Sequence, residues 1–166
     1  WQALNTEYRF TTQYSTQTGT TTDGSAVVTG LSDTSSLDTT YMATGTGINQ
    51  DTYILTVDSA TQVTLSQAAN VTGSASLTFS KVKYAMPAGF DRITDRTQWD
   101  KSKHWEMLGP ETPQQWQWLK SGYISTGPRM RWRQMGGYFQ VWPPMGTNEY
   151  LGFEYVSSYW AQDSSG

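Results

Sequence analysis

Residues 127–144, with the sequence GPRMRWRQMGGYFQVWPP, indicate the fold most clearly. A Gly-Gly pair separates two runs in which apolar residues alternate, which is the pattern of a β-hairpin with a two-residue turn. Because successive side chains of a strand point to opposite faces, three arginines share one face of the first run: Arg129, Arg131 and Arg133. The hairpin therefore predicts an antiparallel sheet with one apolar face and one basic face.

The row of three arginines could bind nucleic-acid phosphates, contact a carboxylate-rich partner, or only solvate the outer face of the sheet. The run after the hairpin predicts a third strand of the same meander, which places Glu149 and Glu154 on the strand beside the arginines. The net charge of the chain is only −3. We therefore expect a solvated or partner-facing side rather than a dedicated nucleic-acid groove.

The composition favours strands over helices. Aromatic residues make up 14% of the 166 residues, with eight Trp and ten Tyr, and sequences rich in aromatic residues and threonine are typical of β-sheets. The chain has no cysteine, which excludes disulfides, thiolate nucleophiles and zinc–thiolate sites. It also has no apolar run of about 18 residues, so we expect no membrane-spanning helix.

Residues 18–80 differ sharply from the rest of the chain. They contain no Trp, Pro, Lys or Arg, and Ser and Thr occupy 25 of the 63 positions. Short alternating runs such as SAVVTGL and TYILTVDS recur between turn signals about every 10 to 12 residues, as in small all-β sandwiches and barrels. We therefore expect an inserted all-β domain over 18–80 and a β-rich scaffold domain built from 1–17 and 81–166.

The scaffold sequence predicts strands on both sides of the insert and one short helix. The runs ALNTEYRFTTQ and SKVKYAM are expected to pair with each other, with the insert hanging from their ends. A helix is expected at about 112–121, because Thr112 suits the N-cap, Pro113 the first helical position and Gly122 the residue after the C-cap. The predicted fold class is α+β, mostly β, with an antiparallel sheet scaffold and a sandwich-like or barrel-like insert.

The residues give little sign of catalysis. His104 is the one histidine in the chain, whereas a metal site needs three or four ligands that converge. The nearest candidates for the two carboxylates of a glycoside hydrolase are Asp91 with Asp95, or Glu106 with Glu111, and the neighbouring arginines favour surface ion pairs instead. We expect a protein that is not an enzyme and that holds no cofactor and no metal.

Tryptophan is the other residue type that needs an explanation. Exposed tryptophans on a β-module stack against sugars in many carbohydrate-binding proteins, whereas buried ones fill a core. The second interpretation is favoured for the six tryptophans of the scaffold's central part: Trp99, Trp105, Trp116, Trp118, Trp132 and Trp142. We therefore expect them to pack inside the sheet scaffold.

Three short patterns carry a resemblance to a known family. They are Pro-x-x-Phe-Asp-Arg at 87–92, Gly-Pro-x-x-Pro-x-x-Trp at 109–116 and Phe-Glu-Tyr at 153–155. With the segments around them, over 1–12 and 84–160, they resemble the head-to-tail adaptor, or tail-tube-like neck protein, of short-tailed bacteriophages. The insert separately resembles a small β-module of phage virion proteins, through VTG, TGTGI and ILTVDSATQVTLS.

The resemblance implies a non-enzymatic structural protein of the virion, assembled in the cytoplasm of the bacterial host. Its partners would be copies of itself in a ring, the portal and tail proteins, and packaged DNA in transient, non-specific contact, with no membrane. Arg129, Arg131 and Arg133 would then face a neighbouring subunit or the lumen. Members of the family carry helices before and after the β-rich region, so we expect this sequence to be a piece of a longer or processed chain.

Two other functions stay open from the sequence. The first is a glycan-binding module of a tail fibre or of a secreted β-protein, which the tryptophans would serve. The second is a single-stranded nucleic-acid-binding β-domain, in which arginines contact phosphates and aromatic rings stack on bases.

Overall fold

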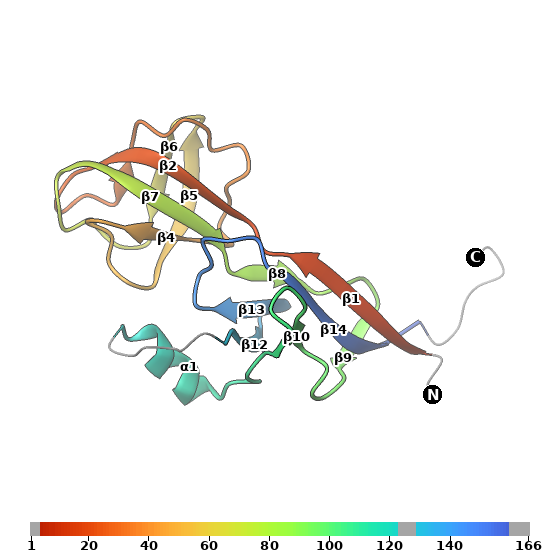
Figure 1. Cartoon of the computed structure of the whole chain (residues 1–166). Coiled ribbons are helices and arrows are strands. Elements are labelled where there is room, and N and C mark those ends of the chain that lie inside the picture. Colours follow the sequence, from red (N-terminus) through yellow and green to blue (C-terminus); the bar gives the residue numbers. More distant parts are fainter. Residues whose placement is uncertain (1–3, 123–128, 160–166) are drawn as a thin grey trace.

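The computed structural model describes residues 4–122 and 129–159. It contains three antiparallel sheets and one short helix, which confirms the predicted fold class, α+β and mostly β. Figure 1 shows a barrel-like sheet at one end of the molecule, and the two remaining sheets and the helix at the other end. We call residues 14–81 the barrel and the remaining described residues the scaffold.

The barrel is one six-stranded sheet with the order β2-β7-β4-β5-β6-β3. Its strands are β2 (Tyr14–Thr21), β3 (Val27–Val28), β4 (Tyr41–Gly45), β5 (Thr52–Ser59), β6 (Gln62–Leu65) and β7 (Gly73–Lys81). A bridge between Thr20 and Thr29 brings the two edges of the sheet together, so that the barrel is nearly closed. The inward-facing residues of the alternating runs form its core, among them Val28, Ile54, Val63, Leu65, Leu77 and Phe79.

The scaffold has two sheets that share one aromatic core. The first joins β1 (Asn5–Thr11), β14 (Tyr150–Ser157), β10 (Trp99–Asp100) and β11 (Trp105–Glu106), with β9 (Phe90–Ile93) also paired to β14. The second joins β12 (Arg131–Met135), β13 (Tyr138–Trp142) and β8 (Lys83–Ala85). Phe139 lies at the centre of the core, stacked against Trp132 and Phe153 with ring centroids 5.2 and 4.8 Å away.

The helix forms where the sequence predicts it. It is α1 (Pro113–Lys120), and the Thr112 hydroxyl accepts a hydrogen bond from the backbone N–H of Gln115 to cap its first turn. Gly122 follows the C-cap with a φ of 92°, a left-handed conformation that favours glycine. Trp116 and Leu119, three residues apart, are both buried against the scaffold core.

Two predicted strand pairings are wrong. The strand at 5–11 pairs with β14 rather than with the strand at 83–85, because its apolar face, with Tyr8 and Phe10, packs in the same core as Phe153. The strands that pair where the chain enters and leaves the insert are β2, just after β1, and β7, just before β8. The expected meander also ends after β13, and residues 143–149 cross to the other sheet, where β14 begins.

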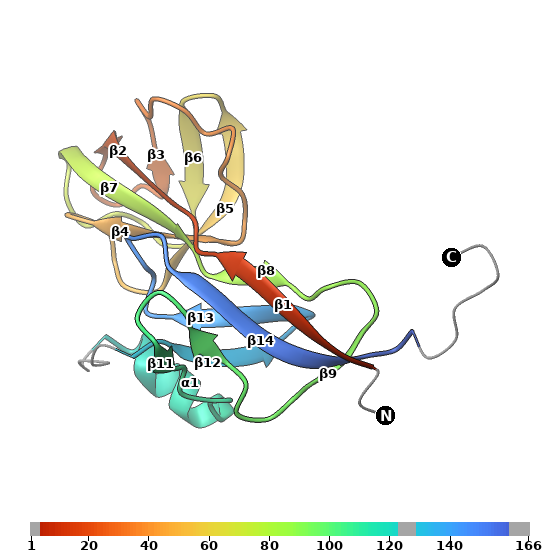
Figure 2. The ribbon, with the colours of Figure 1, turned by 45° about the vertical axis from the view of Figure 1, so that its right-hand side comes forward.

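The barrel rests on the scaffold through specific contacts. Met42, on β4 of the barrel, is 1% exposed and belongs to the scaffold core. Lys120 at the end of α1 forms an ion pair of 3.0 Å with Asp51 on the barrel. The ring of Tyr53 lies between two ammonium groups, with Lys83 4.5 Å and Lys120 5.3 Å from its centroid. Figure 2 shows the barrel seated above the scaffold sheets from a second direction.

Candidate functional site

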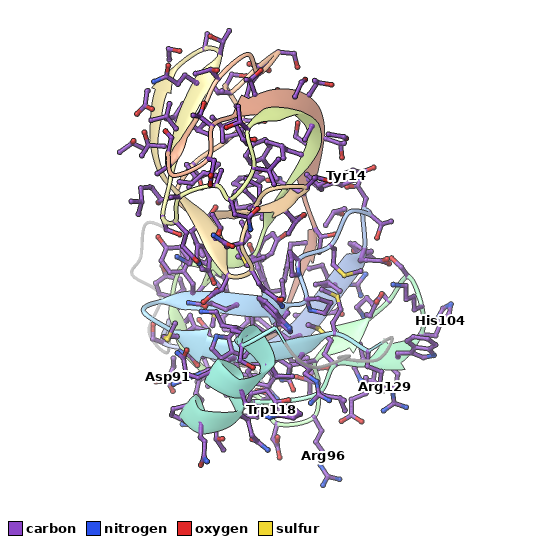
Figure 3. The ribbon with its side chains drawn as sticks, turned by 90° about the vertical axis from the view of Figure 1, so that its left-hand side faces the viewer. Tyr14, Asp91, Arg96, His104, Trp118 and Arg129 are labelled. Atoms are coloured by element: carbon purple, nitrogen blue, oxygen red, sulfur yellow. The ribbon has the colours of Figure 1, made fainter. Side chains whose placement is uncertain are left out.

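The three arginines of 127–144 lie in three different environments. Met130 and Trp132 are buried, as the alternation predicts, and the arginines lie on the opposite side. Arg129 comes before the strand and is exposed, whereas Arg131 and Arg133, both on β12, are half-buried. Figure 3 shows Arg129 pointing outward from the scaffold. The structure therefore does not present the three arginines as one uniform row.

Arg131 is held by a carboxylate that the sequence did not point to. Its Nη1 lies 2.6 Å from Oε1 of Glu111, whose side chain is 8% exposed. The segment before α1 runs beside β12, because Leu108 and Arg131 form a parallel bridge and the backbone N–H of Glu111 donates to the carbonyl of Trp132. These backbone contacts place Glu111 next to Arg131 in a mostly buried position. The prediction that Glu111 forms an ion pair at the surface is therefore wrong.

The expected partners of the arginines lie elsewhere. Glu149 and Glu154 are in the other sheet, because β14 does not follow β13 in a meander. Glu149 is buried and lies 2.8 Å from Lys103. Glu154 faces Glu7 across the pair of β1 and β14. Neither glutamate has an ion pair to Arg129, Arg131 or Arg133 within 4–122 and 129–159.

Arg133 lines an open groove of about 420 Å³. The groove lies between the end of β9, the segment before α1 and β12, and its walls include Arg92, Asp95, Pro110, Pro113, Trp132 and Arg133. We call it the arginine groove. It lies at the end of the scaffold away from the barrel, where β9 and the start of α1 are found in Figures 1 and 2.

The arginine groove is lined by two arginines, Arg92 and Arg133, and by two carboxylates, Asp95 and Glu111, of which Glu111 is engaged by Arg131. Arg133 forms no ion pair with any residue of 4–122 or 129–159, and the one ion pair of Arg92, with Asp91, is 3.4 Å long and exposed. Guanidinium groups bind carboxylates and phosphates through charge-assisted hydrogen bonds, so the two arginines suit the groove to an anionic ligand.

A second charged surface lies on the outer face of the first scaffold sheet. Glu7 contacts both Arg9 and Lys101, with the Lys101 ammonium 2.6 Å from the carboxylate. Hydrogen bonds from Arg9 and then from Lys101 lower the pKa of Glu7 to about 2. Trp99 and Tyr150 are exposed on the same face: Trp99, on β10, lies opposite Gly152, and Tyr150 lies two residues before Gly152 on β14. This face combines fixed charges with rigid aromatic rings.

The six tryptophans divide into buried and exposed sets. Trp116, Trp132 and Trp142 are at most 3% exposed and belong to the core, as expected. The other three do not pack inside, which corrects the sequence-based expectation: Trp99 is 42% exposed, Trp105 37% and Trp118 55%. Trp99 and Trp105 are offset by one residue on paired strands, so their side chains point to opposite faces. The exposed tryptophans thus lie on separate surfaces.

The residues weighed for catalysis do not converge. His104 is exposed in the turn between β10 and β11 with a φ of 57°, and no three His, Cys, Asp or Glu side chains of the described residues are grouped to hold a metal ion. Asp91 forms an exposed ion pair with Arg92, as expected. Within the same residues, no helix is long and apolar enough to cross a membrane.

Comparisons with known proteins give no family for the chain. No protein-family model matches it. Neither the curated proteins nor the solved structures yielded a match.

Proposed function

We propose that this chain is a structural subunit of the neck of a tailed bacteriophage, a head-to-tail adaptor that links portal and tail. It would assemble with copies of itself into a ring in the virion and would not act as an enzyme. The observation that carries the proposal is the distribution of exposed aromatic side chains over several separate surfaces of a rigid scaffold.

The exposed aromatic residues come from different elements. Trp99 and Trp105 lie on the β10–β11 hairpin, Trp118 on α1, Tyr138 at the end of the β12–β13 hairpin and Tyr150 on β14. Aromatic residues are enriched in protein–protein interfaces, and a subunit of a ring needs at least two different contact surfaces. A protein with several aromatic surfaces suits an assembly in which each copy meets more than one neighbour.

The scaffold is built to keep such surfaces in fixed positions. Phe139 is stacked between Trp132 and Phe153, and Phe10 and Tyr84 continue the cluster with centroids 4.4 Å apart. Close-packed aromatic cores leave little freedom for the strands that carry the surface residues. This rigidity supports a mechanical rather than a catalytic role.

The family-like patterns have structural roles in this fold. In the pattern at 109–116, a Cβ on Gly109 would lie 2.4 Å from the carbonyl oxygen of Trp132, and the φ of 149° also favours glycine. The same pattern supplies Pro113 at the first turn of α1 and the buried Trp116. The pattern at 87–92 leads into β9, and the one at 153–155 lies in the middle of β14. The resemblance therefore falls on residues that build the scaffold.

Negative-stain electron microscopy of the purified chain tests the proposal. We expect ring-shaped particles with a central hole, whose fraction increases with protein concentration. Monomers at every concentration, together with no binding to purified portal or tail proteins of the phage that encodes the chain, would contradict it.

One observation favours a glycan-binding module as the second candidate. Trp118 lies in a shallow hollow beside Gln114 and Gln115, whose amides are groups that bind sugar hydroxyls. A titration of tryptophan fluorescence with a panel of oligosaccharides separates the two candidates. Saturable quenching that Trp118→Ala removes would favour the glycan module, whereas no change supports the structural subunit.

A further inference from the structure

Residues 18–80, which make up most of the barrel, carry charge of one sign only. They include five aspartates and no lysine or arginine, and Lys81 at the end of β7 is the first basic residue after them. Two of these aspartates, Asp33 and Asp58, lie close together in the fold, because the Thr34 hydroxyl donates to the carbonyl of Ser59 over 2.6 Å and the N–H of Leu31 donates to the carbonyl of Thr61. We call Asp33, in the loop after β3, and Asp58, near the end of β5, the acidic pole.

Both carboxylates of the acidic pole are held in fixed orientations. Asp58 accepts hydrogen bonds of 2.7 Å from the hydroxyls of Thr56 and Thr64. Asp33 accepts two of 2.9 Å from the N–H and the hydroxyl of Ser35. These hydrogen bonds lower the pKa of each carboxyl, so both are ionised at neutral pH and both are exposed. The pole therefore presents ordered negative charges to a partner.

The arginine groove is the complementary surface. It is lined by the guanidinium groups of Arg92 and Arg133, neither of which has a strong ion pair among the described residues. The carboxylate of Asp95 also lines it. Glu111, the carboxylate beside Arg131, is already engaged by that arginine. The two guanidinium groups outnumber the one carboxylate that is not already paired, and Pro110 and Pro113 give the groove stiff walls.

One copy of the chain cannot bring the two surfaces together. The acidic pole lies at the turn between β5 and β6, at the end of the barrel away from the scaffold, and the arginine groove lies at the opposite end of the molecule (Figures 1 and 2). We infer that the arginine groove of one copy receives the acidic pole of a second copy, in a head-to-tail contact. Such a heterologous contact produces a closed ring when the rotation between copies closes, and an open chain when it does not.

The inference deepens the proposed function and rests on it, since both require self-association of the chain. Two double charge reversals in the purified chain test it: R92E/R133E in the groove, and D33K/D58K in the pole. Each variant alone brings like charges together, so we expect its self-association constant to fall by at least about tenfold. When the two variants are mixed in equal amounts, each groove meets a pole of opposite charge, and association should return.

Matched controls separate the contact from bulk charge. R96E/R129E changes the net charge by the same amount as the groove variant, and both arginines point outward from the scaffold without lining the groove (Figure 3). D23K/D38K is the control for the pole variant. It changes the net charge by the same amount as D33K/D58K, at two other exposed aspartates of the barrel. We expect both controls to associate within about twofold of the unmodified chain. Controls that weaken association as much as the test variants would overturn the inference.

The outcomes also distinguish this contact from the proposed function. Rings that persist in R92E/R133E would overturn the contact and leave the ring function in place. An unmodified chain that never self-associates would overturn both. Salt gives a test that needs no variant, because association through the groove must weaken between low salt and about 0.5 M salt. Association that is unchanged over this range would contradict a contact between charged surfaces.

Discussion

The Arg131 guanidinium donates to the Glu111 carboxylate over 2.6 Å, and the Glu111 side chain is almost completely buried. This ion pair joins β12 to the segment that leads into α1. It gives the middle arginine of 127–144 a structural role, whereas Arg133 lines the arginine groove and has no ion pair within 4–122 and 129–159.

Breaking this pair should destabilise the protein more than replacing both partners. Removing one partner of a buried pair strands the other charge, and because Arg131 is partly exposed we expect Arg131→Met to lower the free energy of unfolding by about 2 to 3 kcal/mol. The double variant R131M/E111L should lose less than the sum of the two single changes. Urea unfolding of all four proteins measures this cycle, and additive losses would show that the pair has no coupling energy.

Two tryptophans on the same helix should respond very differently to truncation. Trp116 is 1% exposed and Trp118 is 55% exposed. Trp116→Ala empties part of the core and should cost about 3 to 5 kcal/mol, whereas Trp118→Ala should change the free energy of unfolding by less than about 0.5 kcal/mol. Similar losses in the two variants, measured by chemical unfolding, would contradict the burial described for α1.

Glu7 should make stability depend on pH in the acidic range. Its pKa of about 2 in the folded state lies below the value of about 4.3 for an unfolded chain. The contribution of Glu7 is therefore complete above about pH 5 and is lost as the pH falls through the folded pKa. Because the carboxylate is partly exposed to solvent, the contribution should not exceed about 1 kcal/mol.

The matched variant for this test is Glu7→Gln, which keeps the shape of the side chain. The difference in free energy of unfolding between the two proteins should be largest near neutral pH and should shrink toward about pH 2.5. A difference that stays constant over this range would show that Arg9 and Lys101 do not stabilise the ionised form of Glu7.

The Gly-Gly turn should tolerate asparagine and reject a branched residue. Gly136 and Gly137 have φ values of 60° and 79°, as a type I′ turn requires. Gly136→Asn should leave the midpoint of thermal unfolding nearly unchanged, because asparagine adopts this conformation readily. Gly136→Val should destabilise the hairpin by about 1 to 2 kcal/mol. Equal effects of the two substitutions would contradict the turn type.

Local patterns predicted the elements of this fold better than their pairing. The helix around Trp116, the hairpin at 136–137 and the barrel-like insert follow from capping residues, turn residues and alternation, which act within a few positions. The pairing of β1 with β14 joins residues that are far apart in the sequence, and many runs with the same period of two compete for one partner. Alternation alone does not choose among them.

The candidate site was only partly visible in the sequence. Alternation correctly placed the arginines opposite Met130 and Trp132, but the arginine groove also needs Arg92 and Pro110, which come from separate segments. One signal was present: the pattern at 109–116 contains the glycine and the prolines that allow its backbone to lie close to Trp132. The split among the tryptophans had no comparable signal, because buried and exposed ones occur in similar contexts.

Sedimentation velocity of the purified chain over a wide range of concentrations tests the central claim most directly. If the chain is a subunit that contacts copies of itself, a discrete species much larger than the 18.6 kDa monomer should appear and grow with concentration. A single species of monomer mass at every concentration and at low salt would contradict the claim.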